Sequence, residues 1–190
     1  MFKRSLRLAG LRRTLWAAAV LCAFGAWPLA RPAGADDIQE YEVKAAYLFN
    51  FARFTEWPSP QEGPIQLCLL GHDPFGSALS GLEGRPVQGR TMHVRRGIAV
   101  GDIPGCHIVF ISDSEERRVP LDVRVANTYP VLTVSDIEGF TDSGGMIGLY
   151  LSDQRVQFDV NLAALRAANL KLPAQVLKLA RQVVNARGQP

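Results

Sequence analysis

The clearest pattern along the chain is a helical period of apolar residues over positions 38–54. Four of them recur every three or four residues on one predicted helix face: Val43, Tyr47, Phe51 and Phe54. Others widen the apolar arc beyond a normal core stripe: Ala46, Leu48 and Phe49. Trp57-Pro58 ends the helix, because a residue before proline disfavours helical angles. Such a helix is either deeply buried or partly an interface, and burial is the favoured interpretation.

Shorter apolar runs follow, separated by turn residues. They predict strands at 65–70, 91–95, 107–112, 131–134, 146–151 and 156–160. Helical patterns lie between and after them, at 75–82, 114–125, 162–168 and 173–186. Asp73-Pro74 has the composition of a helix start, and Pro120 interrupts the second of these helices. Alternating strands and helices predict an α/β fold: a three-layer α/β/α sandwich, with a mostly parallel sheet and an antiparallel C-terminal hairpin turning at 152–155.

The amino-terminal region has a different composition. Residues 1–35 contain six Lys or Arg and no Asp or Glu, then an apolar run, then Ala33-Gly34-Ala35. This order is typical of a secretory signal peptide, with cleavage expected after Ala35. A membrane anchor is the alternative, but the run at 15–29 is shorter than the roughly 20 residues that span a bilayer. We therefore expect a periplasmic protein with one domain at 36–190; Arg12-Arg13 leaves a twin-arginine export route open.

Removing the signal peptide reverses the sign of the net charge. The whole chain has 21 basic and 18 acidic residues, so the mature part keeps 15 and 18, a net charge of −3. Nucleic acids and anionic membranes both require a basic field. The charge therefore argues against a nucleic-acid partner.

Two cysteines, Cys68 and Cys106, remain after processing. Each lies in or beside a predicted strand, and an exported protein enters an oxidising compartment. Neighbouring strands bring residues within bonding distance. We expect a disulfide between them, and two buried free thiols are the alternative.

Catalytic chemistry has little support in the sequence. The segment 71–76 follows a strand, but it lacks the Gly-Lys-Ser/Thr of a phosphate loop and the spacing of a dinucleotide fingerprint. His72-Asp73 with Ser77 is the best catalytic candidate, yet a helix cap and a turn histidine explain these residues equally. The three histidines are not spaced as metal ligands. We therefore predict a binding protein rather than an enzyme, with no catalytic residue, metal or cofactor.

Several sequence blocks, taken in order, resemble a known family. They read VKAAYLFNFARF at 43–54, TEWP at 55–58, LCLLGHDPFG at 67–76, CHIVFI at 106–111, VLTVSD at 131–136, GF at 139–140, GGMIG at 144–148, RVQFDVNL at 155–162 and LKL at 170–172. Each block alone is weak evidence for a family, but all of them in this order are specific to one family. The chain is identified as a member of the YfiR family of periplasmic proteins, over about residues 38–184.

This resemblance implies a regulatory function. The best-understood members bind the periplasmic sensor region of an inner-membrane diguanylate cyclase and hold it inactive, which lowers cyclic-di-GMP and biofilm formation. An outer-membrane, peptidoglycan-binding lipoprotein sequesters the repressor, and redox state bears on the control. Those members carry cysteines at the positions of Cys68 and Cys106, which supports the disulfide. The repressor subgroup also has a second cysteine pair, whereas this chain has no cysteine after Cys106.

Two modes of action follow. In the first, the wide apolar face of the first helix, with Phe49, Phe54 and Trp57, docks a protein partner; plain core packing explains the same residues. A second copy of the chain is a further candidate partner. In the second, the protein is a small-ligand sensor for a kinase or uptake receptor, with a pocket near Gly71–Gly76 and Asp136–Phe140 at the carboxyl edge of the sheet.

Overall fold

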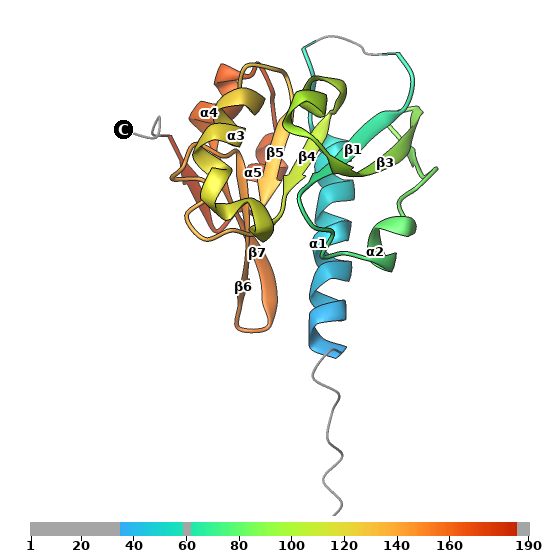
Figure 1. The fold of residues 1–190 in the computed structure, drawn as a ribbon. Helices are drawn as coiled ribbons and strands as arrows, with labels where there is room; N and C mark the ends of the chain where they lie inside the picture. Colours follow the sequence, from blue (N-terminus) through green and yellow to red (C-terminus); the bar gives the residue numbers. More distant parts are fainter. Residues whose placement is uncertain (1–34, 59–61, 186–190) are drawn as a thin grey trace, which may run out of the picture. The chain divides into compact units, whose positions relative to one another are not determined.

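A computed structural model describes residues 35–58 and 62–185 (Figure 1). Apart from Ala35, the predicted signal peptide at 1–35 lies outside these residues. All the elements below belong to one unit of the chain. In the two described stretches, no helix combines the length and the apolar character needed to cross a bilayer.

One mixed sheet of eight strands organises the domain, in the order β2-β3-β1-β4-β5-β6-β7-β8 (Figure 1). Neighbours from β3 to β6 pair in parallel, as do β7 and β8, whereas β2–β3 and β6–β7 are antiparallel. The predicted parallel sheet with a late hairpin is thus confirmed. The strands are β1 Ile65–Leu70, β2 Pro86–Val87, β3 Arg90–Ile98, β4 Ile108–Ile111, β5 Leu132–Ser135, β6 Ile147–Ser152, β7 Arg155–Asn161 and β8 Gln182–Val184.

Helices cover the sheet through two separate apolar clusters. The first core takes buried side chains from α1, α2, α4 and α5, and the second core from η1 and α3. In β4, Ile108 and Phe110 join the first core, while Val109 and Ile111 join the second. This alternation explains why the strand is apolar throughout. The helices are α1 Ala35–Phe54, α2 Ser77–Ser80, η1 Val100–Gly105, η2 Asp113–Arg118, α3 Val119–Ala126, α4 Leu162–Ala167 and α5 Ala174–Leu177.

The buried face of α1 differs from the predicted one. Its fully buried side chains are Lys44, Ala45, Leu48, Phe51 and Ala52. Val43 and Phe54, at the two ends of the predicted stripe, are each 39% exposed. Because the apolar arc is so wide, the spacing of apolar residues did not determine which face of the helix is buried. The small side chains of Ala45 and Ala52 lie against the first core, and the helix is rotated accordingly.

The predicted helix at 173–186 is wrong beyond its first turn. Helix α5 ends at Leu177, and the chain then forms β8 at the edge of the sheet. Val183 and Val184 pair with Val160 and Asn161 of β7. β-branched valines favour this extended backbone. Pairing with β7 therefore outweighs the weak helix propensity of the segment.

Two other predicted helices are shorter or less regular than expected. The helix at 75–82 reduces to the single turn of α2, because Asp73 stabilises a turn instead of starting a helix. Its Oδ1 accepts the backbone N–H groups of Phe75 at 2.8 Å and Gly76 at 3.2 Å. The helix at 114–125 divides into η2 and α3, and Pro120 lies in the first turn of α3, where its missing N–H costs little.

Candidate functional site

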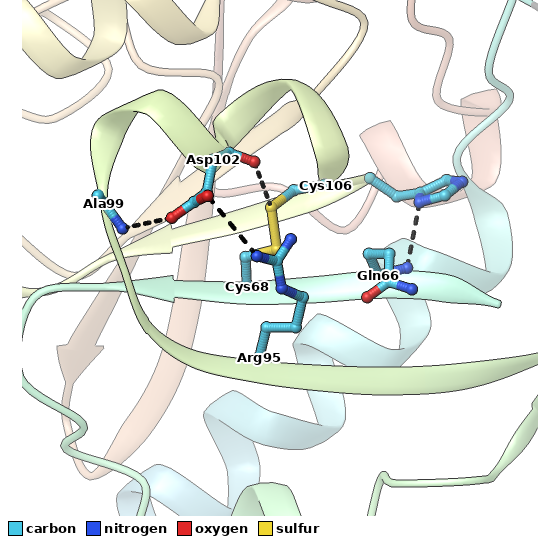
Figure 2. Close-up of a disulfide and its surroundings, with 7 residues drawn as sticks. Gln66, Cys68, Arg95, Ala99, Asp102 and Cys106 are labelled. Atoms are coloured by element: carbon cyan, nitrogen blue, oxygen red, sulfur yellow. Dashed lines mark hydrogen bonds and ion pairs between the residues drawn. A yellow bond between two sulfur atoms is a disulfide. The ribbon is translucent and has the colours of Figure 1, made fainter.

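Cys68 and Cys106 are joined in a disulfide, as the sequence predicted. Cys68 lies in β1 and Cys106 follows η1, just before β4, with their Cα atoms 6.0 Å apart (Figure 2). Both residues are buried in the second core. The bond therefore ties the loop that enters β4 to the neighbouring central strand.

An ion pair lies beside the disulfide. Figure 2 shows Arg95 of β3 approaching Asp102 of η1, at 3.8 Å between Nη2 and Oδ1. The other oxygen of Asp102 accepts the N–H of Ala99 at 2.9 Å. The Asp102 carbonyl oxygen lies 3.6 Å from the sulfur of Cys106. The disulfide and these contacts together fix η1 against the sheet.

The predicted docking residues on and after α1 differ in exposure and in their neighbours. Phe54 is partly exposed, with the Arg53 guanidinium 5.4 Å from its ring. Phe49 is half-buried, and Arg85 covers its ring at 4.1 Å. Trp57 is half-buried with its ring edge-on to His107 at 5.5 Å. A partner-binding role for these three residues stays a prediction, and Phe54 offers the most accessible ring.

The carboxyl ends of β1 and β4 are where an open α/β sheet usually binds ligands. The connection after β1 runs through α2 in the first core, and the connection after β4 runs through α3 in the second. The two connections approach each other closely at Gly71 and Ser114. Gly71 has φ +88°, and a Cβ at this position would clash with Ser114 Oγ, which accepts the His72 N–H at 2.9 Å. Gly71 is thus required both for its backbone angle and for its close approach to Ser114.

Two cavities lie at this edge of the sheet. The larger, of about 660 Å³, includes much of the predicted pocket segment at 136–140 in its wall; we name it the acidic cavity. The smaller, of about 560 Å³, is lined by residues 73–78 with Glu40 and Tyr41. The acidic cavity is lined by Glu40, Lys44, Asp136, Glu138, Gly139, Thr141, Asp142, Leu149, Tyr150, Leu151, Ser152, Asp159, Arg181 and Gln182.

A buried ion network forms one wall of the acidic cavity. The Lys44 ammonium lies 2.5 Å from both Glu40 Oε1 and Asp136 Oδ2. The Tyr41 hydroxyl donates to the same Asp136 oxygen at 3.0 Å. Burial, reinforced by the Asp136 charge, raises the pKa of Tyr41, so this hydroxyl keeps its proton and remains a donor. The network ties α1 to the residue that follows β5.

A second ion pair also lines the acidic cavity. Arg181 makes two hydrogen bonds to the buried Asp159 carboxylate, at 2.9 Å and 2.5 Å. Its guanidinium lies over the Tyr150 ring, 4.4 Å from the centroid. The arrangement holds the chain at the point where it enters β8.

The sequence pattern predicted neither the Lys44 network nor the Arg181–Asp159 pair. Lys44 interrupts an apolar helix face four residues after Glu40, and this was the one available signal. Asp136 is 92 residues further along the chain, so its contact with Lys44 depends on the fold.

The catalytic candidate His72-Asp73-Ser77 is not assembled as a catalytic group. Asp73 pairs with Arg96 at 2.7 Å and accepts two backbone N–H groups, while His72 and Ser77 are exposed. Among the described residues, no three His, Cys, Asp or Glu side chains gather closely enough to hold a metal ion.

His107, the residue after Cys106, is buried beside the disulfide. Its Nδ1 accepts the Gln66 N–H at 3.1 Å, and its Nε2 faces the Arg90 guanidinium at 3.1 Å. A protonated ring would set two N–H groups against two donors. Burial, with the Arg90 charge, lowers the pKa of His107 to about 4.

We expect His107 to make the protein less stable in mild acid. The unfolded state takes up a proton near pH 6.5, whereas the folded state resists it until about pH 4. As the pH falls through this window, the unfolded state binds more protons, so about 2–3 kcal/mol of stability is lost. Urea unfolding at pH 7 and pH 4.5 should show His107→Gln losing less stability than the unmodified protein, with the exposed His72→Gln as control. Equal losses in all three proteins would contradict this role.

The chain matches several solved structures at low sequence identity. A conserved domain protein from Vibrio cholerae O1 biovar El Tor has a TM-score of 0.48 over 75% of this chain, and an ABC domain in complex with L-Trp from Streptococcus pneumonia has 0.49 over 76%. A ligand-free, open substrate-binding protein from Clostridium difficile has 0.50 over 76% and shows a related fold. Each is 9% identical, and this chain spans 60% of the length of each.

The sequence model of YfiR/HmsC-like proteins matches residues 41–181. The match begins within α1 and ends at residue 181, just before β8. It includes both disulfide cysteines and, except for Glu40, both ion networks. At the family level it supports a periplasmic regulator of the diguanylate cyclase pathway, and this regulator family is non-catalytic. The disulfide is consistent with that compartment. The chain belongs to the YfiR/HmsC-like family.

Proposed function

We propose that this protein binds the periplasmic sensor region of an inner-membrane diguanylate cyclase and holds the enzyme inactive. The observation that carries the proposal is the family match over residues 41–181. An outer-membrane, peptidoglycan-binding lipoprotein that removes the regulator from the cyclase, and a second copy of the chain, are further proposed partners. The signal peptide and the effect on biofilm formation belong to the same proposal.

The mechanism is differential binding. A regulator shifts a two-state enzyme only as far as it prefers one conformation over the other. Moving a cyclase from 99% active to 99% inactive requires a preference of about 5.5 kcal/mol. An interface with a few well-packed aromatic anchors supplies free energy on this scale.

The outer side of α1 is the proposed docking surface. Val43 and Phe54 both keep more than a third of their surface exposed there. The Lys44 network fixes this helix to Asp136 after β5, so the surface is presented on a rigid element. Rigid presentation lowers the entropic cost of binding.

We expect Phe54→Ala to weaken cyclase binding by about 30-fold, corresponding to about 2 kcal/mol for one central aromatic. The free energy of unfolding should change little, because the ring is partly exposed and outside the first core. Biolayer interferometry against the cyclase periplasmic region measures the first quantity, and urea unfolding the second.

Leu121→Ala is the matched control, since Leu121 is 53% exposed on α3, over the second core. It should bind like the unmodified protein. If Phe54→Ala binds normally, or if both variants lose affinity equally, the docking surface does not lie on α1.

A small-ligand sensor is the second candidate, and the acidic cavity is the observation that favours it. In this function, a periplasmic metabolite occupies the cavity and the protein serves a sensor kinase or uptake receptor. Thermal unfolding against a set of periplasmic metabolites separates the two functions. A saturable rise in melting temperature, with no protein captured from membranes, favours the sensor; capture of a cyclase without any such rise favours the regulator.

A further inference from the structure

The hairpin formed by β6 and β7 continues past the end of β5. Its register runs as far as the pair Ser152–Arg155, whereas β5 pairs with β6 only at Ile147 and Gly148. Figure 1 shows the hairpin projecting from the rest of the sheet. After Leu149, therefore, no strand of the described chain lies opposite the β5 side of β6.

The backbone groups of Leu151 point to this open side. In an antiparallel pair, successive residues bond alternately toward the partner strand and away from it. The Asn161 N–H donates to the Met146 carbonyl at 2.8 Å, so even-numbered residues of β6 face β7 and odd-numbered ones face the β5 side. The parallel register with β5 ends at Gly148 and engages at most the N–H of Leu149. The Leu149 carbonyl and both backbone groups of Leu151 are thus available to an added strand.

The acidic cavity lies along this edge. Residues 149–152 of β6 line it, and so does Asp136, the residue that follows β5. The cavity of about 660 Å³ is therefore where a longer β5 would continue. An unpaired strand edge is a template for another extended segment, which gains main-chain hydrogen bonds when it is added to the sheet.

The two faces of such an added strand would meet different surroundings. Leu149 belongs to the first core, so Leu151, two residues further along β6, points to the same face and is 54% exposed there. Phe140 belongs to the second core, on the other face. Its neighbours Glu138 and Asp142 are exposed, line the cavity and pair with no cation of the described chain. One face thus favours an apolar side chain and the other a basic one.

We propose that the open edge of β6 binds an extended segment of a protein partner in which basic and apolar residues alternate. The segment pairs with the backbone at Leu149 and Leu151, and its basic side chains reach Glu138 and Asp142. Charge favours this occupant over a second copy of the chain. Five carboxylates and two cations line the cavity, a formal charge of −3, so two copies joined at this edge would repel each other. The inference goes beyond the proposed function, because the contact does not require the partner to be a cyclase.

Fluorescence anisotropy with a labelled, blocked pentapeptide of alternating lysine and valine tests the proposal. We expect saturable binding of one peptide per chain, and no binding of the counterpart in which glutamate replaces lysine. Two N-methylated isomers test the backbone contact, one methylated at both valines and the other at the second and third lysines. Alternate N–H groups of a strand face one way, so one isomer should bind like the parent peptide and the other about 10-fold more weakly.

Leu151→Pro should weaken binding of the parent peptide by about 10-fold, because it removes the N–H that faces the open edge. This N–H does not bond to β7, and edge strands tolerate proline, so the hairpin should survive. Leu151→Ala is the matched control. It removes the same leucine side chain but keeps the N–H, and should stay within about 3-fold of the unmodified protein. Circular dichroism checks that both variants are folded.

A second pair of variants tests the charge. Glu138→Gln/Asp142→Asn should weaken binding of the parent peptide by about 5-fold, as expected for two exposed ion pairs. Glu62→Gln/Glu116→Gln removes the same charge at exposed positions outside the cavity and should bind normally. Equal weakening in both variants would indicate general charge attraction and contradict the proposal.

The proposal also fails if the peptide does not bind saturably, if the two methylated isomers bind equally, or if Leu151→Pro binds as well as Leu151→Ala. Should Leu151→Pro not fold, the methylated isomers decide alone. A dimer of the protein that Leu151→Pro dissociates would assign the edge to a second copy and overturn the proposal. Cyclase binding is measured in parallel with Phe54→Ala and Leu151→Pro, so the peptide site and the regulator function can fail independently.

Discussion

Replacing Cys68 and Cys106 together by alanine is expected to lower the free energy of unfolding by about 4 kcal/mol. The bond closes a loop with a sequence separation of 38 residues, and the chain-entropy model assigns about this value to such a loop. The two sulfurs also lie in the second core, where truncation leaves unfilled volume. A loss of this size is a large part of the stability of an ordinary domain.

Urea unfolding under oxidising and reducing conditions measures this effect. A reductant should shift the midpoint of the unmodified protein toward that of the double variant and leave the variant unchanged. Equal midpoints for the unmodified and variant proteins under oxidising conditions would show that the bond does not stabilise the domain.

Lys44→Met is expected to cost about 3–5 kcal/mol, the second of the two largest effects. The substitution keeps most of the side-chain volume but leaves Glu40 and the largely buried Asp136 without their cation. An uncompensated buried charge is far more destabilising than the loss of an exposed pair. Thermal and urea unfolding at neutral pH measure the change.

A second substitution distinguishes charge from packing. Asp136→Asn in the Lys44→Met background removes the orphaned charge while its amide oxygen still accepts from Tyr41. It should restore at least about 2 kcal/mol of the loss. If the double variant is no more stable than Lys44→Met, the lysine contributes through packing rather than through its charge.

The central strands were predictable from the sequence because their pattern has one physical cause. A strand covered on both faces is buried at every position, and β4 is accordingly apolar throughout. In β5 the buried Thr133 and Ser135 are polar, but their hydroxyl groups form hydrogen bonds within the core. The tight hairpin between β6 and β7 was also recognisable. Its turn residues Asp153 and Gln154 both adopt positive φ, at 49° and 60°, as the right-handed twist of a hairpin favours.

The errors occurred where local preference and tertiary packing disagree. The stretch 173–186 has a helical pattern, but the edge of β7 offers backbone hydrogen bonds that an isolated helix end cannot match. The sequence also did not reveal which face of α1 packs against the core, because apolar residues surround most of the helix. Neither the strand at the end of the chain nor the buried face of α1 is determined by neighbouring residues in the sequence alone.

The position of the candidate site was partly predictable, but its chemistry was not. The carboxyl ends of parallel strands gather at one edge, so segment 136–140 was expected to line a pocket. The side chains that give the cavity its character lie far apart in sequence. Lys44 and Asp136, for example, are charged groups whose burial makes sense only once the fold brings them together.

Cyclic-di-GMP synthesis provides the most direct test of the regulatory role. A cyclase captured from membranes by this protein is reconstituted in vesicles with its periplasmic region accessible, and the purified protein is titrated against it. We predict a saturable fall in the rate of synthesis. Phe54→Ala should require about 30-fold more protein for the same inhibition, whereas Leu121→Ala should inhibit at the same concentration as the unmodified protein. A rate of synthesis that stays constant at saturating protein would contradict the account.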